Sequence, residues 1–145
     1  CAEVLRHHSP VPMTLREANI DTSIQGVHVP KGTMIYIVPW ATNRDPKLWG
    51  ADVDEFEPER WLNDASGGAG TNYALLTFLH GPRSCIGEKF ARGEFACLVA
   101  AFVGRFEFEL ADPRMADERT IPIKRGATSK PENGLWMKTR KVEGW

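Results

Sequence analysis

The strongest pattern of apolar positions lies between Ile86 and Phe106, where apolar residues recur at spacings of one, three and four. The residues that carry this pattern are Phe90, Ala91, Phe95, Leu98, Ala101 and Phe102. Such spacing is typical of an α-helix, because residues three and four apart lie on the same face. Cys97 and Val99 widen the apolar face further. We therefore predict one long helix over residues 86–106, and we expect it to be mostly buried.

Shorter apolar runs elsewhere in the chain predict β-strands. Ile24–Val29 and Thr33–Val38 are rich in β-branched residues, and they flank Pro30-Lys31-Gly32. Proline presets a turn and glycine relieves it, so we predict a β-hairpin across these three residues. Runs near Phe106–Leu110 and Leu135–Thr139 predict small strands toward the end of the chain.

Helical and irregular segments account for most of the remainder. Cys1–His8 is predicted to be the end of a helix, which Ser9-Pro10-Val11-Pro12 stops because proline disfavours helix in the residue before it. We interpret its two adjacent histidines as surface residues at the helix end. Trp40–Asp45 is predicted to be a short helix. Trp49–Thr77 lacks periodicity, and a segment that long without regular structure is usually functional or held from outside. The five tryptophans are interpreted as packing groups.

Composition narrows the class of protein. The 145 residues are 42% hydrophobic and 26% charged, as in soluble globular domains. Lys and Arg total 18 against 19 Asp and Glu, which argues against a nucleic-acid partner because such binding needs a basic excess. The longest apolar stretch, Phe95–Val103, is far too short to span a membrane. We interpret the start at Cys1 as a cut rather than a natural N-terminus. Three cysteines without paired spacing predict neither a disulfide framework nor a zinc site.

The run Phe78–Gly87 carries the candidate chemistry. Cys85 lies where the predicted helix begins, and the partial positive charge of a helix N-terminus favours a thiolate over a thiol. A thiolate is the ligand that gives a haem iron strong electron donation. Gly81 and Gly87 are expected to let the backbone take positive φ and approach the sulfur closely. Arg83 offers a planar fork suited to a carboxylate such as a haem propionate.

This run resembles the haem-binding loop of the cytochrome P450 family. The match is position for position: Phe, two free positions, Gly, one free, Arg, one free, Cys, one free, Gly. A cysteine buried under a helix is the alternative, but five matched residues make a chance match rare. By the resemblance Cys85 is the axial ligand of the iron in haem b. The residues that the resemblance assigns to the cofactor are Phe78 near the sulfur, Gly81 and Gly87 in the loop, Ala91 against the porphyrin, and Arg83 and Arg16 at the propionates.

A second motif, Glu3-x-x-Arg6, is informative only because of where it lies in the chain. Glu3 and Arg6 are three residues apart, so on a helix they share a face and can pair. The spacing alone is uninformative, because Glu57 and Arg60 repeat it. The order along the chain is that of the family: the pair, a proline-rich turn, a hairpin, Phe56–Trp61 and then the cysteine loop. The resemblance therefore implies that Glu3, Arg6 and Arg60 form a buried structural lock, and the alternative is three solvated surface charges.

Two further segments resemble parts of the family that face the haem and the substrate. Arg16 follows the proline turn, where the family has its second propionate-binding arginine, and a surface arginine is the alternative. The residues implied to line the substrate pocket are Val11, Met13, Thr14, Leu15, Ala127 and Thr128.

The resemblance implies an α+β fold: the C-terminal portion of a cytochrome P450, forming a single partial domain over residues 1–145. It implies a monooxygenase that inserts one oxygen atom of O₂ into a small hydrophobic organic substrate. An NADPH-dependent reductase would donate the electrons. The complete protein is expected at the cytosolic face of the endoplasmic reticulum, held by an N-terminal anchor outside this chain, as in fungal microsomal members.

Two alternatives remain open at this point. A thiolate-haem isomerase or dehydratase shares the loop but needs neither O₂ nor a reductase. A truncated, non-catalytic fragment is the other alternative. We expect no catalytic residue beyond the haem ligand within these residues, because the family's distal oxygen-activating helix is not among them. Residues 1–145 alone are therefore expected to be inactive.

Overall fold

The computed structural model describes residues 1–144, except for the side chain of Arg125. The chain divides into two compact units. The first is Ala2–Leu79, and the second comprises Cys1 and the residues from His80 onward. Both combine helices with small antiparallel sheets, which is the predicted α+β class. The single partial domain over residues 1–145 stays a prediction.

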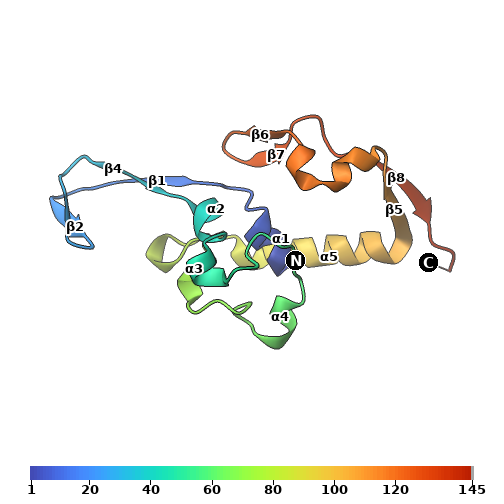
Figure 1. Ribbon diagram of the computed structural model, residues 1–145, viewed down its shortest axis with the longest axis horizontal. Helices are drawn as coiled ribbons and strands as arrows, with labels where there is room; N and C mark the ends of the chain where they lie inside the picture. The colour runs from blue at the N-terminus through green and yellow to red at the C-terminus, as the bar shows by residue number, and fades with distance from the viewer. Residues whose placement is uncertain (145) are drawn as a thin grey trace. The chain divides into compact units, whose positions relative to one another are not determined.

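The first unit begins with a short helix and two separate strand pairs (Figure 1). β1 pairs with β4 and β2 pairs with β3, both antiparallel. The bounds of these elements are α1 Ala2–His7, β1 Thr14–Glu17, β2 Thr22–Ile24, β3 Val27–Val29 and β4 Met34–Ile37.

The predicted hairpin across Pro30-Lys31-Gly32 is wrong, although strands do lie on both sides of that turn. The tight hairpin joins β2 to β3 across Gln25 and Gly26, whose φ angles are 49° and 81°. Positive φ at both central residues defines a two-residue turn whose twist matches that of paired strands. This turn therefore closes the hairpin instead. β4 pairs instead with β1, which follows the earlier proline turn at residues 9–12. The Gly32 N–H donates to the Ala18 carbonyl at 2.8 Å and continues this ladder.

The regular structure in the remainder of the first unit consists of single helical turns. Their bounds are α2 Pro39–Thr42, α3 Pro46–Trp49, α4 Arg60–Asn63 and the 3₁₀ turn η1 Asn72–Ala74. The short helix expected over residues 40–45 corresponds to α2, shifted by one residue at its start. Asp45 begins α3 by accepting the Lys47 N–H at 2.9 Å, ahead of a proline in the first turn.

The apolar core of this unit is small. Trp49, Val53 and Ala74 form it, with Leu48, Trp61, Ala69 and Leu75 packed around them. Four of its largest fully buried side chains are polar: Arg6, His7, Glu3 and Asn43. Buried polar groups are costly unless they are hydrogen-bonded, so the contacts of these four residues hold the segments of the unit together.

The second unit is built around one long helix, α5, which spans Glu88–Arg105 (Figure 1). The other elements are η2 Gly81–Arg83, β5 Phe106–Leu110, η3 Pro113–Ala116, η4 Glu118–Thr120, β6 Ile123–Arg125, β7 Ser129–Pro131 and β8 Met137–Lys141. β5 pairs with β8 and β6 with β7, both antiparallel. The two predicted late strands are therefore confirmed, and they are each other's partners.

The long helix is confirmed between residues 88 and 105, but its predicted burial is wrong. None of its residues is buried in the structure, and Phe90 and Val103 are 75% and 66% exposed. Within its own unit, the apolar face meets β5 near one end, where the rings of Phe102 and Phe108 lie 6.3 Å apart. A helix that is apolar nearly all round is buried only where enough other segments pack against it. Among the described residues, no helix is long and apolar enough to cross a membrane.

Candidate functional site

The cysteine loop enters α5 through a short series of turns. Gly81 and the two residues after it form the 3₁₀ turn η2, which the Ser84 N–H closes by donating to the Gly81 carbonyl at 3.0 Å. The Cys85 carbonyl accepts the N–H of Glu88, the first residue of α5, at 3.4 Å. Cys85 therefore lies three residues before the first residue of the helix, and Gly87 occupies the N-cap position.

The two glycines of the loop play different parts. Gly81 has φ of 77°, as expected for a residue that needs the left-handed region. Gly87 has φ of −90°, so the expectation of a positive φ there is wrong. A Cβ atom added to Gly87 would lie 3.9 Å from the Cys85 sulfur, which is ordinary van der Waals contact. Neither backbone strain nor a clash with the sulfur therefore requires glycine at position 87.

The sulfur of Cys85 lies at an accessible, largely apolar surface. Cys85 is exposed and forms no disulfide. Ile86 is fully exposed, Phe90 is 75% exposed, and Ala91 is half-buried on the first turn of the helix. The guanidinium of Arg83 is exposed and makes no hydrogen bond or ion pair with any described residue. A thiol, an unpaired guanidinium and exposed apolar side chains therefore occur within one short stretch.

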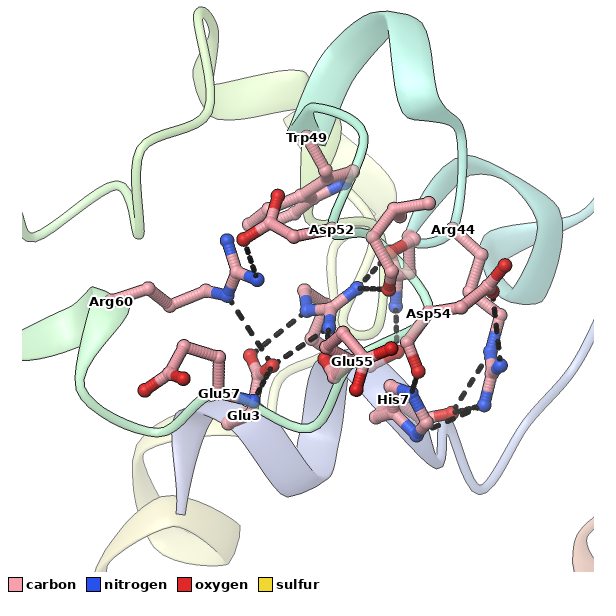
Figure 2. A network of polar contacts seen from close by, with 12 residues as sticks. Glu3, His7, Arg44, Trp49, Asp52, Asp54, Glu55, Glu57 and Arg60 are labelled. Atoms are coloured by element: carbon pink, nitrogen blue, oxygen red, sulfur yellow. Dashed lines mark hydrogen bonds and ion pairs between the residues drawn. The ribbon is translucent and has the colours of Figure 1, made fainter.

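Glu3 is the centre of the second predicted constellation (Figure 2). Its Oε1 accepts from Arg6 Nη2 at 2.7 Å, from the Glu57 N–H at 3.0 Å and from Arg60 Nε at 3.3 Å. Its Oε2 accepts from Arg6 Nε and from Trp61 Nε1, both at 2.9 Å. Glu3, Arg6 and Arg60 are therefore brought together, and five donors saturate one carboxylate.

The surroundings of Glu3 decide its ionisation. Burial acts to raise the pKa of the carboxyl group, because it disfavours the charged form. The hydrogen bonds from Arg6, Trp61 and the Glu57 amide, with the positive charge of Arg6, outweigh burial and lower the pKa from 4.5 to about 2. Glu3 is therefore a carboxylate at neutral pH, as pairing with two arginines requires.

Arg6 connects this carboxylate to the residues on both sides of α3. Its Nη1 donates to the Asn43 and Val53 carbonyls at 3.0 and 2.8 Å, and its Nη2 donates to the Glu55 carbonyl at 3.1 Å. The guanidinium also lies over the ring of Trp49, 5.2 Å from its centroid. The fully buried charge of Arg6 therefore has a partner on every side, and it organises a segment that has no regular structure of its own.

Two polar contacts in this network were missed from the sequence. Trp61 is more than the predicted packing group, because its indole N–H donates to Glu3. A buried indole N–H needs an acceptor, and that requirement is the feature of the sequence that could have predicted this contact. His7 was interpreted as a surface residue and is buried, whereas His8 is exposed as expected. The His7 Nε2 lies 3.0 Å from the Asp54 carbonyl, and its Nδ1 lies 3.1 Å from Arg44 Nη2 (Figure 2).

The remaining predicted site residues lie in both units. Phe78 is half-buried in the first unit. Arg16 lies on β1, half-buried, with Nη1 donating to Thr14 Oγ1 at 3.1 Å and to the Leu15 carbonyl at 2.7 Å. Val11, Met13 and Leu15 are exposed and Thr14 is half-buried, while Ala127 and Thr128 are exposed between β6 and β7. Their roles toward a cofactor or a substrate stay predictions.

Comparison with known proteins gives one consistent result. A family model described as Cytochrome P450 matches residues 1–136. The cytochrome P450 monooxygenase sphH of Aspergillus fumigatus is 48% identical over 148 residues, covering 100% of this chain and 26% of the relative. The cytochrome P450 monooxygenase buaD of Petromyces alliaceus is 46% identical, over 99% of this chain and 28% of its own length.

A solved structure, the retinoic acid bound cyanobacterial CYP120A1, superposes with a TM-score of 0.84 at 29% identity. The match covers 97% of this chain and 31% of the other. The predicted α+β fold of a C-terminal cytochrome P450 portion is confirmed by this likeness. The chain spans between about a quarter and a third of the length of the proteins that it matches.

Proposed function

Because the chain belongs to the cytochrome P450 family, we propose that it forms the haem-binding part of a monooxygenase, with Cys85 as the iron ligand. The observation that carries this proposal is the position of Cys85: exposed, just before α5, in a run that matches the family's haem-binding loop at every defined position. The relatives named above are described as monooxygenases, which supports this reaction over isomerisation or dehydration.

The residues around Cys85 fit a haem. A thiolate is a ligand that haem iron accepts, a guanidinium suits a propionate, and exposed apolar side chains suit the face of a porphyrin. When bound, the haem supplies the activation of O₂ that allows one oxygen atom to enter an organic substrate. We propose haem b, with Cys85 at the iron, Arg83 at one propionate and Ala91 against the ring, while Gly81 and Gly87 leave room in the loop.

The resemblance to the family also suggests roles for the remaining residues. We propose that Phe78 packs near the sulfur and that Arg16 binds the second propionate. Glu3, Arg6 and Arg60 would act as a structural lock that holds the irregular segment in place. The residues proposed to face a small hydrophobic substrate are Val11, Met13, Thr14, Leu15, Ala127 and Thr128.

The complete protein would need an electron source. We propose an NADPH-dependent reductase, and a location at the cytosolic face of the endoplasmic reticulum membrane, as in microsomal members of the family. The fungal origin of the named relatives is in keeping with this proposal.

The test uses the complete polypeptide that carries this sequence, loaded with haem and mixed with a fungal NADPH-dependent reductase and ¹⁸O₂. A panel of small apolar substrates is incubated with and without the reductase. We expect products that carry one labelled oxygen atom, formed only when reductase and NADPH are both present. Conversion without O₂ or reductase would contradict the monooxygenase and identify an isomerase or dehydratase. A purified protein that binds no haem would contradict both.

A further inference from the structure

A buried amide connects the end of α1 to the segment that leads into the cysteine loop. Asn43 is completely buried, and its backbone ends α2. Its Oδ1 accepts the Leu76 N–H at 2.8 Å. Its Nδ2 donates to Thr77 Oγ1 at 2.8 Å and to the Arg6 carbonyl at 3.2 Å. The amide therefore uses its acceptor and both of its donors, and it ties two segments 33 and 37 residues away in the chain.

Thr77 extends this connection. Its hydroxyl accepts from Asn43 and donates to the Leu5 carbonyl at 2.7 Å. The last carbonyls of a helix have no partner within the helix, so side chains must satisfy them where they are buried. At the end of α1 the Leu5 carbonyl is satisfied by Thr77 and the Arg6 carbonyl by Asn43. We call these hydrogen bonds the Asn43–Thr77 link.

The backbone is strained at Leu79, two residues after Thr77. The Leu79 N–H donates to the Leu76 carbonyl at 2.9 Å and closes a turn over residues 76–79. Leu79 has φ of 58°, in the left-handed region that residues with a Cβ atom rarely adopt. Such a conformation persists only where the surrounding structure fixes it. The link fixes Leu76 and Thr77 directly before Phe78, the first residue of the cysteine loop.

We propose that Asn43 and Thr77 are positioning residues for the cysteine loop. They anchor the turn that begins the loop to the helix that carries Glu3 and Arg6, and the thiolate of Cys85 depends on this anchor although it lies eight residues further along the chain. The inference rests on the proposed function, since it concerns the binding of haem iron by that sulfur. Both residues are inferred to act through the backbone that leads into the loop.

The experiment compares two substitutions at one position in the haem-loaded complete polypeptide. Thr77→Val keeps the branched shape and removes the hydroxyl, which leaves the Leu5 carbonyl and one Asn43 N–H without a partner. Thr77→Ser keeps the hydroxyl in a smaller side chain. The readout is the ferrous carbon-monoxide spectrum at equal haem content, which separates thiolate-bound from non-thiolate-bound iron. We expect Thr77→Val to raise the ratio of non-thiolate to thiolate form about ten-fold, and Thr77→Ser to keep the parent ratio.

A control separates positioning from general loss of stability. Val53→Ala truncates a buried core residue of the same unit that makes no side-chain hydrogen bond, and it should lower the temperature of unfolding without changing the spectrum. A spectral change in Val53→Ala equal to that in Thr77→Val would overturn the proposal. So would a parent-like ratio in Thr77→Val, or a shifted ratio in Thr77→Ser. If the parent itself shows no thiolate-type band, the proposed function fails rather than the positioning role.

Discussion

Replacing Glu3 by glutamine tests the lock, because it removes the charge while keeping the size of the side chain. Glutamine keeps the length and shape of the side chain. It cannot serve as the counter-ion of Arg6 and Arg60, which lie 2.7 and 3.3 Å from Glu3 Oε1. Its amide also brings N–H donors toward the donor of Trp61. Removing one partner of a buried ion pair is strongly destabilising, because the other charge stays buried and uncompensated.

The pKa of Glu3 gives the pH-dependent part of this cost. The carboxyl group titrates at about 2 in the folded protein against 4.5 ordinarily. That difference corresponds to about 3 kcal/mol of folding free energy. Because the folded pKa is the lower one, the unfolded chain binds more protons between these two values. The stabilisation by Glu3 is therefore fully present above about pH 4.5, and it is lost as the pH falls toward 2.

The assay is urea-induced unfolding of parent and Glu3→Gln at a series of pH values, followed by tryptophan fluorescence. We expect Glu3→Gln to lower the free energy of unfolding by about 3 kcal/mol or more at pH 7. The difference from the parent should shrink by about 3 kcal/mol as the pH falls from 4.5 to about 2. Glu57→Gln is the matched control, since that side chain is exposed and should change stability by less than about 0.5 kcal/mol. A gap that is the same at every pH, or no larger than that of Glu57→Gln, would refute this reasoning.

Two further predictions concern the cofactor and the loop that covers Trp61. Arg83→Leu and Arg16→Leu should each lower haem retention by about one to two orders of magnitude while the remaining haem keeps its thiolate spectrum; variants that both hold haem as tightly as the parent would show the assignment to be wrong. Gly67→Ala should lower the free energy of unfolding by about 1–2 kcal/mol more than Gly68→Ala. Both glycines have positive φ, but a Cβ at Gly67 would lie 3.0 Å from the Trp61 ring, whereas a Cβ at Gly68 would meet no described residue within 4 Å. Equal losses in thermal unfolding would contradict that contact.

Local features were predictable from the sequence because local pattern determines them. The 3.6-residue periodicity predicted α5, and the short apolar runs near Phe106–Leu110 and Leu135–Thr139 predicted β5 and β8. The cysteine loop could be identified from five residues at fixed spacing. The turn at Gln25-Gly26 also had a local signal, since a glycine between two runs of β-branched residues is typical of a two-residue hairpin. The stronger proline turn nearby obscured it.

Long-range contacts were not predictable in the same way. Asn43 and Thr77 are polar residues in turn-rich segments, and nothing near them indicates that one is fully buried or that they bond to each other. The burial of His7 depends on Asp54 and Arg44, which are 47 and 37 residues away. The exposure of α5 likewise depends on which segments lie against it, and periodicity describes only the face that a helix offers.

The central claim is that Cys85 supplies the iron ligand, and its most direct test is the ferrous carbon-monoxide spectrum of the haem-loaded complete polypeptide. The parent should show a thiolate-type Soret band, and Cys85→Ser should lose it. Cys97→Ser is the matched control, because Cys97 is also exposed but lies within α5, more than two turns beyond its first residue, so the band should stay. An unchanged thiolate-type band in Cys85→Ser would contradict the account.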